Sequence, residues 1–256
     1  MFVPKLLGGY FMAQPWSFKE DYIVCKFYLE HAQSWKENFE HLMTLLRDND
    51  FSNRDKGSVR MRVQNYESLH SGKGLSNVAK QSRDIYSAML KRITNPGKYQ
   101  VLHSQLNSSA LGNLVKAPTN VHSYIKVGPP LGESFHIVFE RFLSASGLTD
   151  PQVYGSCNMG RDTFWRIRNK KNASINKKTA VQLCFGLKLS YEDSIILIEA
   201  AGFYLAPGDE FDHVIITYLK NNDYDVNDVN LSLAERKVPE SLFLLQKNRK
   251  SPYDEE

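Results

Sequence analysis

The sequence predicts an all-α protein with two helical domains, a flexible linker between them and extra acidic helices near the C-terminus. Apolar residues recur every three to four positions over most of the chain, and no run alternates apolar and polar residues as a half-buried strand does. Residue pairs that favour helix starts precede several of these periodic segments. Apolar residues make up 42% of the 256 residues, which is enough to build a core.

The first domain is expected over residues 15–97 and contains four helices. A capping box, in which a Ser and a Glu side chain each satisfy a free backbone N–H, is found at the first two helix starts. Asn95-Pro96-Gly97 should end the fourth helix, because proline and glycine disfavour helix interiors. The capping boxes are Ser17 with Glu20 and Ser34 with Glu37, and the third and fourth helices are expected over about Gly57–Leu69 and Leu75–Ile93.

Residues 98–133 are rich in Ser, Asn, Gly and Pro and show no sustained period, so a flexible linker is expected there. Residues 1–14 are expected to be a flexible extension, and residues 238–256 a flexible tail. Leu7-Gly8-Gly9 can be encoded by codons that contain a purine-rich ribosome-binding sequence. Because these residues stand shortly before Met12, we hypothesise that Met12 is the native start.

The second domain is expected over residues 134–237, where helical periodicity resumes. Five helices should be followed by two acidic ones. Asp150 is expected to be the N-cap of the second helix, because proline follows it at the first helical position. The expected helices begin at Ser134, cover Asp150–Cys157 and Arg161–Asn169, resume after Asn176 and Ser190, and end with about Pro207–Lys220 and Asp225–Arg236.

Basic residues are clustered along the chain, although the formal net charge is only +4. Residues 54–98 hold ten basic and three acidic residues, and residues 161–188 hold eight basic residues and one acidic residue. Residues 189–256 hold six basic and fourteen acidic residues. Two compact basic stretches are the pattern expected of a protein that binds a polyanion, although solvated helix faces would give the same pattern.

Trp16 and Trp35 each lie at or just before an expected helix start. Their spacing resembles that of Myb/SANT-like domains, three-helix units in which tryptophans form the core. The resemblance covers the first domain to about residue 93, and it implies that the third helix contacts DNA. Tyr66 lies farther along than the family's third tryptophan. An ordinary three-helix bundle would also place tryptophans in its core.

The third helix of this unit carries side chains suited to base recognition. Val59, Val63 and Tyr66 should face the core, which leaves the polar side chains outside. Arginine pairs bidentately with guanine in the major groove, and asparagine or glutamine pairs with adenine. A glycine-rich turn follows that lacks the P-loop pattern but could contact one phosphate. The candidate DNA-binding residues here are Arg60, Arg62, Gln64, Asn65 and, in the turn, Lys73.

Residues 134–202 resemble the lambda-repressor-like (Xre/Cro-type) helix-turn-helix family, in which the third of five helices enters the major groove. Met159, Phe164 and Ile167 match that family's inward-facing positions in the turn and the third helix. The resemblance implies that the outward side chains contact bases and that the residues just after them contact phosphate. Those candidates are Arg161, Thr163, Trp165, Arg166, Arg168, Lys170, Lys177 and Lys178.

The sequence departs from the family pattern at two positions. Trp165 stands where a small or polar residue is usual, and Asp162 would face a negatively charged ligand. Trp165 could pack on a sugar or a flipped base, or the C-terminal helices could cover it, and burial is the favoured interpretation. A helix-turn-helix unit kept only for protein contacts is a further alternative.

No sequence feature predicts an enzyme. The seven histidines are scattered without a ligand pair, and three cysteines without a CxxC pair fit a reducing cytoplasm. No apolar stretch of about 18 residues is present, so no membrane contact is expected. We therefore expect a cytoplasmic protein without cofactor or metal. The remaining acidic cluster is interpreted as a solvated face and comprises Asp209, Glu210, Asp212, Asp223, Asp225 and Asp228.

These observations predict a bacterial-type, sequence-specific regulator whose two helix-turn-helix units both bind double-stranded DNA. Tethering would raise affinity about 10²- to 10⁴-fold, because the second contact becomes intramolecular. The alternative is a DNA-binding adaptor of a restriction or phage-defence system, which docks a partner protein through the acidic helices at 207–236. RNA binding and homodimer formation are left open.

Overall fold

The computed structural model describes residues 15–73, 77–107, 133–170 and 173–245. Within these ranges the chain forms twelve α-helices, one short 3-10 helix and no β-strand, which confirms the all-α prediction. No helix in these ranges is long and apolar enough to cross a lipid bilayer. The expected extension at residues 1–14 lies outside the described part of the chain.

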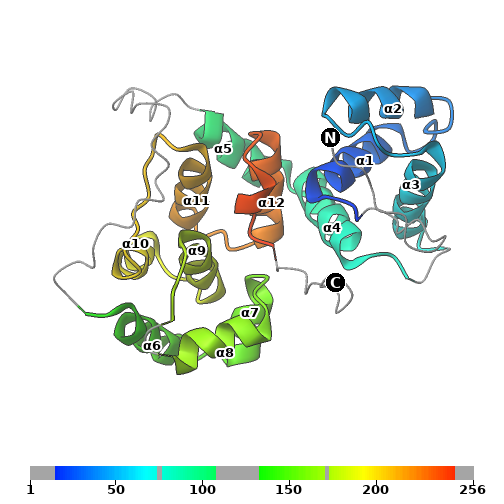
Figure 1. Cartoon of the computed structure of the whole chain (residues 1–256). Helices are drawn as coiled ribbons and strands as arrows, with labels where there is room; N and C mark the ends of the chain where they lie inside the picture. The colour runs from blue at the N-terminus through cyan, green and yellow to red at the C-terminus, as the bar shows by residue number, and fades with distance from the viewer. Residues whose placement is uncertain (1–14, 74–76, 108–132, 171–172, 246–256) are drawn as a thin grey trace. The chain divides into compact units, whose positions relative to one another are not determined.

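The chain divides into two compact units: unit 1 extends to Arg83, and unit 2 begins at Asp84. Unit 1 holds three complete helices and the start of a fourth (Figure 1). In this unit α1 packs against both α2 and α3. The helices are α1 (Phe18–His31), α2 (Phe39–Asp48), α3 (Lys56–Ser71) and α4 (Lys80–Thr94), and α4 continues into unit 2.

The two capping boxes expected in unit 1 have different outcomes. Ser17 Oγ accepts the Glu20 N–H at 3.2 Å and Glu20 Oε2 accepts the Ser17 N–H at 2.8 Å, so the first is confirmed. The second is wrong, because α2 begins only at Phe39 and Ser34 lies in the turns before it. Ser34 Oγ accepts instead from the Asn38 amide at 3.2 Å, which holds that turn.

The core of unit 1 forms where the apolar side of α3 packs on α1. Val59, Val63 and Tyr66 are fully buried, as their spacing predicted. Trp35 is buried as well, whereas Trp16 is half-buried. Only one of the two tryptophans therefore fills the core as the resemblance implied.

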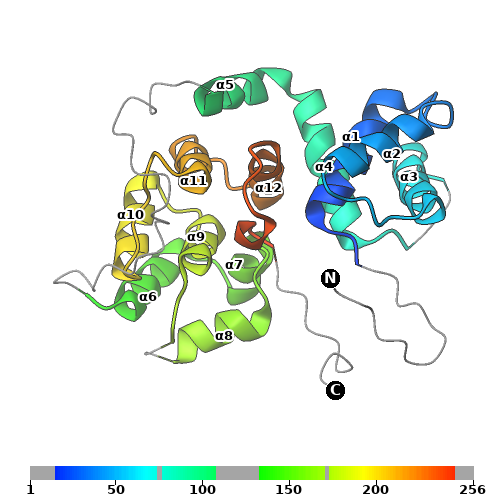
Figure 2. The same cartoon turned by 45° about the horizontal axis from the view of Figure 1, so that its top comes forward.

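Unit 2 is layered around α9, whose residues are almost all buried (Figure 2). On one side lie α6, α7 and α8; α7 packs on α9, and α8 packs on α6 and α7. On the other side α11 packs on α10, α12 and α5. The remaining helices are α6 (Phe135–Ser146), α7 (Asp150–Ser156), α8 (Arg161–Asn169), α9 (Lys177–Gly186), α10 (Tyr191–Ala200), α11 (Glu210–Lys220) and α12 (Val226–Glu235).

The expected linker begins too early in the sequence. One residue after the end of α4, Pro96 starts α5 (Pro96–Asn107), because the first helical turn does not need the N–H that proline lacks. Leu102 and Leu106 of α5 are buried, and α5 packs on α11. Residues 98–107 thus belong to unit 2, and the units divide after Arg83 and not after residue 97. Residues 108–132 of the expected linker lie outside the described ranges.

The expected C-terminal tail also begins too early. Phe243 and Leu244 are fully buried after a short 3-10 helix, η2 (Glu240–Leu242). Asn230 Oδ1 accepts the Leu244 N–H at 2.7 Å, and Asn230 Nδ2 donates to Leu244 O at 3.3 Å. The chain therefore remains part of unit 2 to residue 245, and residues 246–256 lie outside the described part.

Candidate nucleic-acid interface

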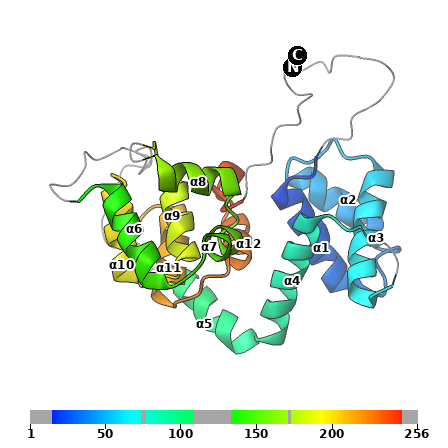
Figure 3. The ribbon, with the colours of Figure 1, turned by 90° about the horizontal axis from the view of Figure 1, so that it is seen from below.

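Helix α8 follows α7 through a short turn, the order of elements in a helix-turn-helix pair (Figure 3). α7 has Thr149 as its N-cap, one residue before the predicted Asp150, because Gln152 completes a capping box with Thr149. In the turn, Asn158 has a φ of 53°, a left-handed conformation that Asn tolerates better than most residues. The Met159 N–H donates to Tyr154 O at 2.9 Å and closes the turn.

One side of α8 anchors the helix and the other faces solvent. Phe164 and Ile167 are buried at 2% and 1% exposure, as their positions predicted. Trp165 is 59% exposed, so the expectation that C-terminal helices cover it is wrong. The physical reason is its direction on the helix: α8 packs on α6 and α7 through its buried side, and Trp165 lies outside that side. Among the other candidates, Arg161, Arg166 and Lys170 are exposed and Thr163 is half-buried.

Arg168 is exposed but engaged within unit 2. Its Nη1 lies 2.5 Å from Asp150 Oδ2, and its Nε lies 3.7 Å from Glu140 Oε1. These carboxylates belong to the start of α7 and to α6. Arg168 therefore ties α8 to the helices beside it, and two acids offset its charge.

Lys177 is not the surface residue that the sequence predicted. Its side chain is fully buried, and Nζ lies 2.6 Å from Oδ2 of the equally buried Asp212. The same oxygen accepts the Ala206 N–H at 2.7 Å. Burial raises the pKa of Asp212, and Lys177 and the Ala206 N–H offset part of that increase. Of the two neighbouring lysines, Lys177 and Lys178, only Lys178 is partly exposed, and it remains a candidate for phosphate contact.

In unit 1 the expectation that Arg62 reaches a base is also wrong. Its side chain is only 12% exposed, with Nη1 2.5 Å from Ser82 Oγ and 3.3 Å from Asp21 Oδ2. The Arg62 guanidinium lies 4.5 Å from the centre of the Trp16 ring, and that of Arg54 lies 4.4 Å from it. The side chains of both arginines therefore make their contacts inside unit 1.

The other candidates on α3 remain at the surface. Arg60 and Gln64, one turn apart, are exposed, and Asn65 is half-buried. The Arg60 guanidinium lies 4.9 Å from the centre of the Phe39 ring, so it rests partly on its own unit. Lys73 is exposed in the turn after α3. The structure thus leaves a smaller basic surface on α3 than the sequence predicted.

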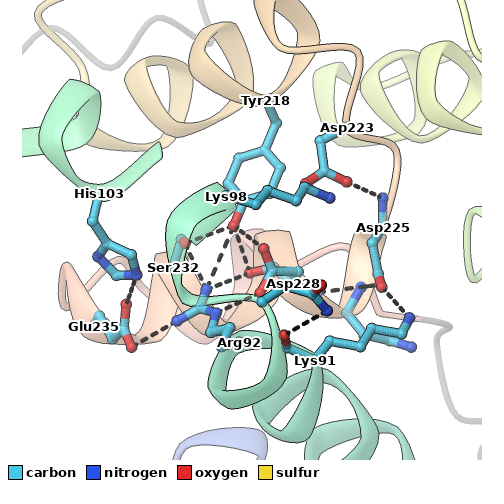
Figure 4. A network of polar contacts seen from close by, with 12 residues as sticks. Lys91, Arg92, Lys98, His103, Tyr218, Asp223, Asp225, Asp228, Ser232 and Glu235 are labelled. Atoms are coloured by element: carbon cyan, nitrogen blue, oxygen red, sulfur yellow. Dashed lines mark hydrogen bonds and ion pairs between the residues drawn. The ribbon is translucent and has the colours of Figure 1, made fainter. Parts of the chain in front are cut away.

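The interpretation of the C-terminal acids as a solvated face is wrong for Asp212, Asp223 and Asp228, which are buried. Figure 4 shows the principal cluster, in which Arg92 of α4 contacts α12. Arg92 Nε lies 2.5 Å from Asp228 Oδ1, and Nη1 lies 2.8 Å from Glu235 Oε1. Basic residues of the first stretch thus neutralise acids of the second domain within unit 2.

Two further contacts extend this cluster (Figure 4). Lys91 Nζ lies 2.5 Å from Asp225 Oδ2, and Lys98 Nζ lies 2.9 Å from Asp223 Oδ2. Burial by itself would lower the pKa of Arg92, but the surrounding acids and Tyr218 outweigh this effect and raise it. A protein partner attracted by these acids would find most of them already paired.

Sequence reasoning missed the partners of these buried charges, although one signal was present. Asp212 lies between Phe211 and His213 at the start of α11, and Val214, Ile215 and Ile216 follow, all of them buried. A carboxylate in a mostly apolar, buried helix segment needs a cationic or hydrogen-bonding partner, because an unpaired buried charge is very costly. The pattern indicates that such a partner exists, and only the fold identifies it as Lys177.

Comparisons with protein-family models, curated proteins and solved structures found no match for this chain. Among the described residues, no group of three or more His, Cys, Asp and Glu side chains is placed to hold a metal ion.

Proposed function

We propose that the chain is a sequence-specific DNA-binding protein, a transcriptional regulator that contacts the major groove of double-stranded DNA with α8. The observation that supports this most directly is the solvent-facing side of α8. Arg161 and Arg166 are exposed there, and within the described residues their side chains make no hydrogen bond or ion pair. Lys170 follows at the end of the helix. Arginines that are exposed at the start and middle of the second helix of a helix-turn-helix pair are suited to guanine recognition.

The pairing of charges elsewhere strengthens this assignment. Lys177 and Arg92 are neutralised inside unit 2, so their charge is not offered to a ligand. The residue before α8 is Gly160, which supplies no capping side chain. The partial positive charge of a helix N-terminus favours a phosphate nearby, although Asp162 in the first turn of α8 offsets part of it. Apart from Lys188, the exposed basic residues of the second stretch that the structure describes lie on α8 or directly after it.

The test compares charge removal on α8 with equal charge removal elsewhere in unit 2. A duplex selected from a random library is titrated with the full chain, and binding is followed by fluorescence anisotropy. Arg161→Ala or Arg166→Ala should cost about 1–3 kcal/mol and relax the preference at one base pair. The control is Lys220→Ala, which removes one exposed positive charge at the end of α11 and should leave affinity nearly unchanged.

Salt dependence provides an independent check. Affinity should fall by about 0.9 log unit per phosphate contact for each tenfold rise in salt concentration. Affinity that is equal in all four proteins, or that stays flat with salt, would contradict DNA binding through α8.

A second candidate function is an adaptor in which unit 2 holds DNA and unit 1 holds a protein. One observation favours it: Met61, on the outer side of α3, is 66% exposed beside Arg60. Arg60→Ala with Gln64→Ala in the full chain separates the two candidates. If α3 contacts DNA the double variant binds the selected duplex more weakly, and if unit 1 docks a protein the affinity for DNA is unchanged.

A further inference from the structure

The most unusual feature of the α8 surface is its tryptophan. A tryptophan side chain has roughly 150–250 Å² of surface to bury, and most of that of Trp165 is left in water at 59% exposure. Its neighbours Phe164 and Ile167 are fully packed, so the exposure of Trp165 does not reflect a loosely packed helix.

The surroundings of Trp165 define the chemistry of a ligand. Arg161 lies one turn before Trp165 on the same ridge of α8, and Arg166 follows it in sequence, also exposed. Asn169 lies one turn after, but its Nδ2 donates to Trp165 O at 2.9 Å and so folds back on the helix. This surface therefore offers an apolar indole with guanidinium groups beside it, together with one exposed acid, Asp162, one turn before Trp165.

In the major groove the acceptors that suit arginine are guanine N7 and O6, and the apolar group on the base edges is the C5-methyl of thymine. We propose that Trp165 packs on the C5-methyl group of a pyrimidine in duplex DNA, next to a guanine contacted by Arg161 or Arg166. This inference rests on the proposed function of α8. The methyl group belongs to thymine or to 5-methylcytosine, which present it at the same place in the groove.

The geometry favours a methyl contact over stacking on an extruded base. An extruded base is held in a pocket between side chains on both of its faces. Trp165 lies on the solvent side of one helix, and the adjacent buried side chains of α8 point the other way. A groove edge can be covered by one exposed indole, whereas an extruded base needs a second wall.

The test removes the methyl group without changing base pairing. In the selected duplex each thymine is replaced in turn by deoxyuridine, and in a second series each cytosine is replaced by 5-methylcytosine. For the wild-type chain, loss of the contacted methyl should weaken binding about fourfold, the factor that corresponds to about 0.8 kcal/mol for one buried carbon group. Trp165→Ala should bind the thymine and deoxyuridine duplexes equally, and Trp165→Phe should retain part of the difference.

The outcomes separate this inference from the function on which it rests. A fourfold loss at one thymine identifies thymine as the source of the methyl, and a gain at one cytosine identifies 5-methylcytosine. If neither series changes wild-type binding while Arg161→Ala still weakens it, α8 binds DNA but Trp165 does not contact a methyl group. Tighter binding of a duplex with an unpaired base, if it is lost in Trp165→Ala, also overturns the inference.

If Arg161→Ala and Arg166→Ala leave DNA binding unchanged, the proposed function itself fails. Thermal unfolding should be alike in all variants, because Trp165 is exposed.

Discussion

Lys177 provides the sharpest contrast between what the sequence predicted and what the structure requires. Removing a lysine that contacts phosphate would weaken DNA binding and leave stability unchanged. Lys177 instead lies buried 2.6 Å from Asp212, so Lys177→Met should leave an uncompensated carboxylate in the interior. Loss of one partner of a buried ion pair typically costs about 3–5 kcal/mol. For a unit of this size that corresponds to a fall in melting temperature of roughly 6–20 °C.

Two variants serve as controls. Lys177→Met with Asp212→Asn removes both charges but keeps an oxygen to accept the Ala206 N–H, so most of the stability should return. Lys178→Ala removes a partly exposed lysine from the next position and should change stability by less than about 0.5 kcal/mol. Urea unfolding followed by circular dichroism gives the free energies, and hydrogen exchange of peptides from α9 and α11 locates the loss in unit 2.

The pH dependence of Lys177→Met follows from Asp212. Burial raises the pKa of Asp212 above its ordinary value of 3.8, and without Lys177 less opposes that increase. The folded variant then binds a proton that the unfolded chain releases, so acidification relieves the penalty. The loss of stability relative to wild type should be larger at pH 8 than at pH 5. If Lys177→Met is as stable as wild type and binds DNA more weakly, Lys177 faces solvent and the burial argument is wrong.

Three further predictions concern other buried groups. Arg92→Lys should destabilise unit 2 in urea unfolding nearly as much as Arg92→Ala, by up to about 3–5 kcal/mol. The reason is that lysine cannot form the two contacts of the guanidinium with Asp228 and Glu235. A lysine variant as stable as wild type would contradict this prediction. Burial by itself would raise the pKa of Glu20, but hydrogen bonds from Arg54 and Ser17 outweigh burial and lower the pKa below 4.5. The stability that ionised Glu20 adds is therefore present above about pH 4.5 and is lost as the pH falls through the lowered pKa. In Glu20→Gln, unfolding at pH 3 and pH 6 should differ less than in wild type, and an equal difference would exclude this pair. Burial raises the pKa of both Cys157 and Cys184 to about 12, so mass spectrometry should find no iodoacetamide adduct on either thiol at pH 8 until urea unfolds the chain.

The sequence predicted the helices of both units well, because apolar spacing and capping are local properties. Ser17 and Asn176 cap the helices they were expected to cap, and α8 spans the predicted residues Arg161–Asn169. The errors occur where one local signal has two meanings. Pro96 predicts the end of a helix, but it is also the first residue of α5. The sequence predicts a tail at the buried Phe243, because nothing local shows that Asn230 binds the backbone of the next residue, Leu244.

The candidate site was less predictable, because charge along the chain does not show which charges meet. The first basic stretch contains Arg62 and Arg92, and the acidic C-terminal stretch contains Asp228; each finds a partner far away in sequence. The net charge of a segment therefore overstates what its surface offers. Only the fold separates lysines and arginines that stabilise the interior from those that a ligand can reach.

This separation gives the exposed arginines of α8 their significance. Burying an arginine requires acids around it, and unit 2 places such acids at Arg92, while Arg168 is held by Asp150 and Glu140. Arg161 and Arg166 have no comparable partner among the described residues, and Trp165 stands between them in sequence with its indole exposed. A helix that pairs its last arginine internally and leaves its first two and its tryptophan exposed has the surface expected of a nucleic-acid contact, because an acidic, partly apolar groove satisfies all three side chains together.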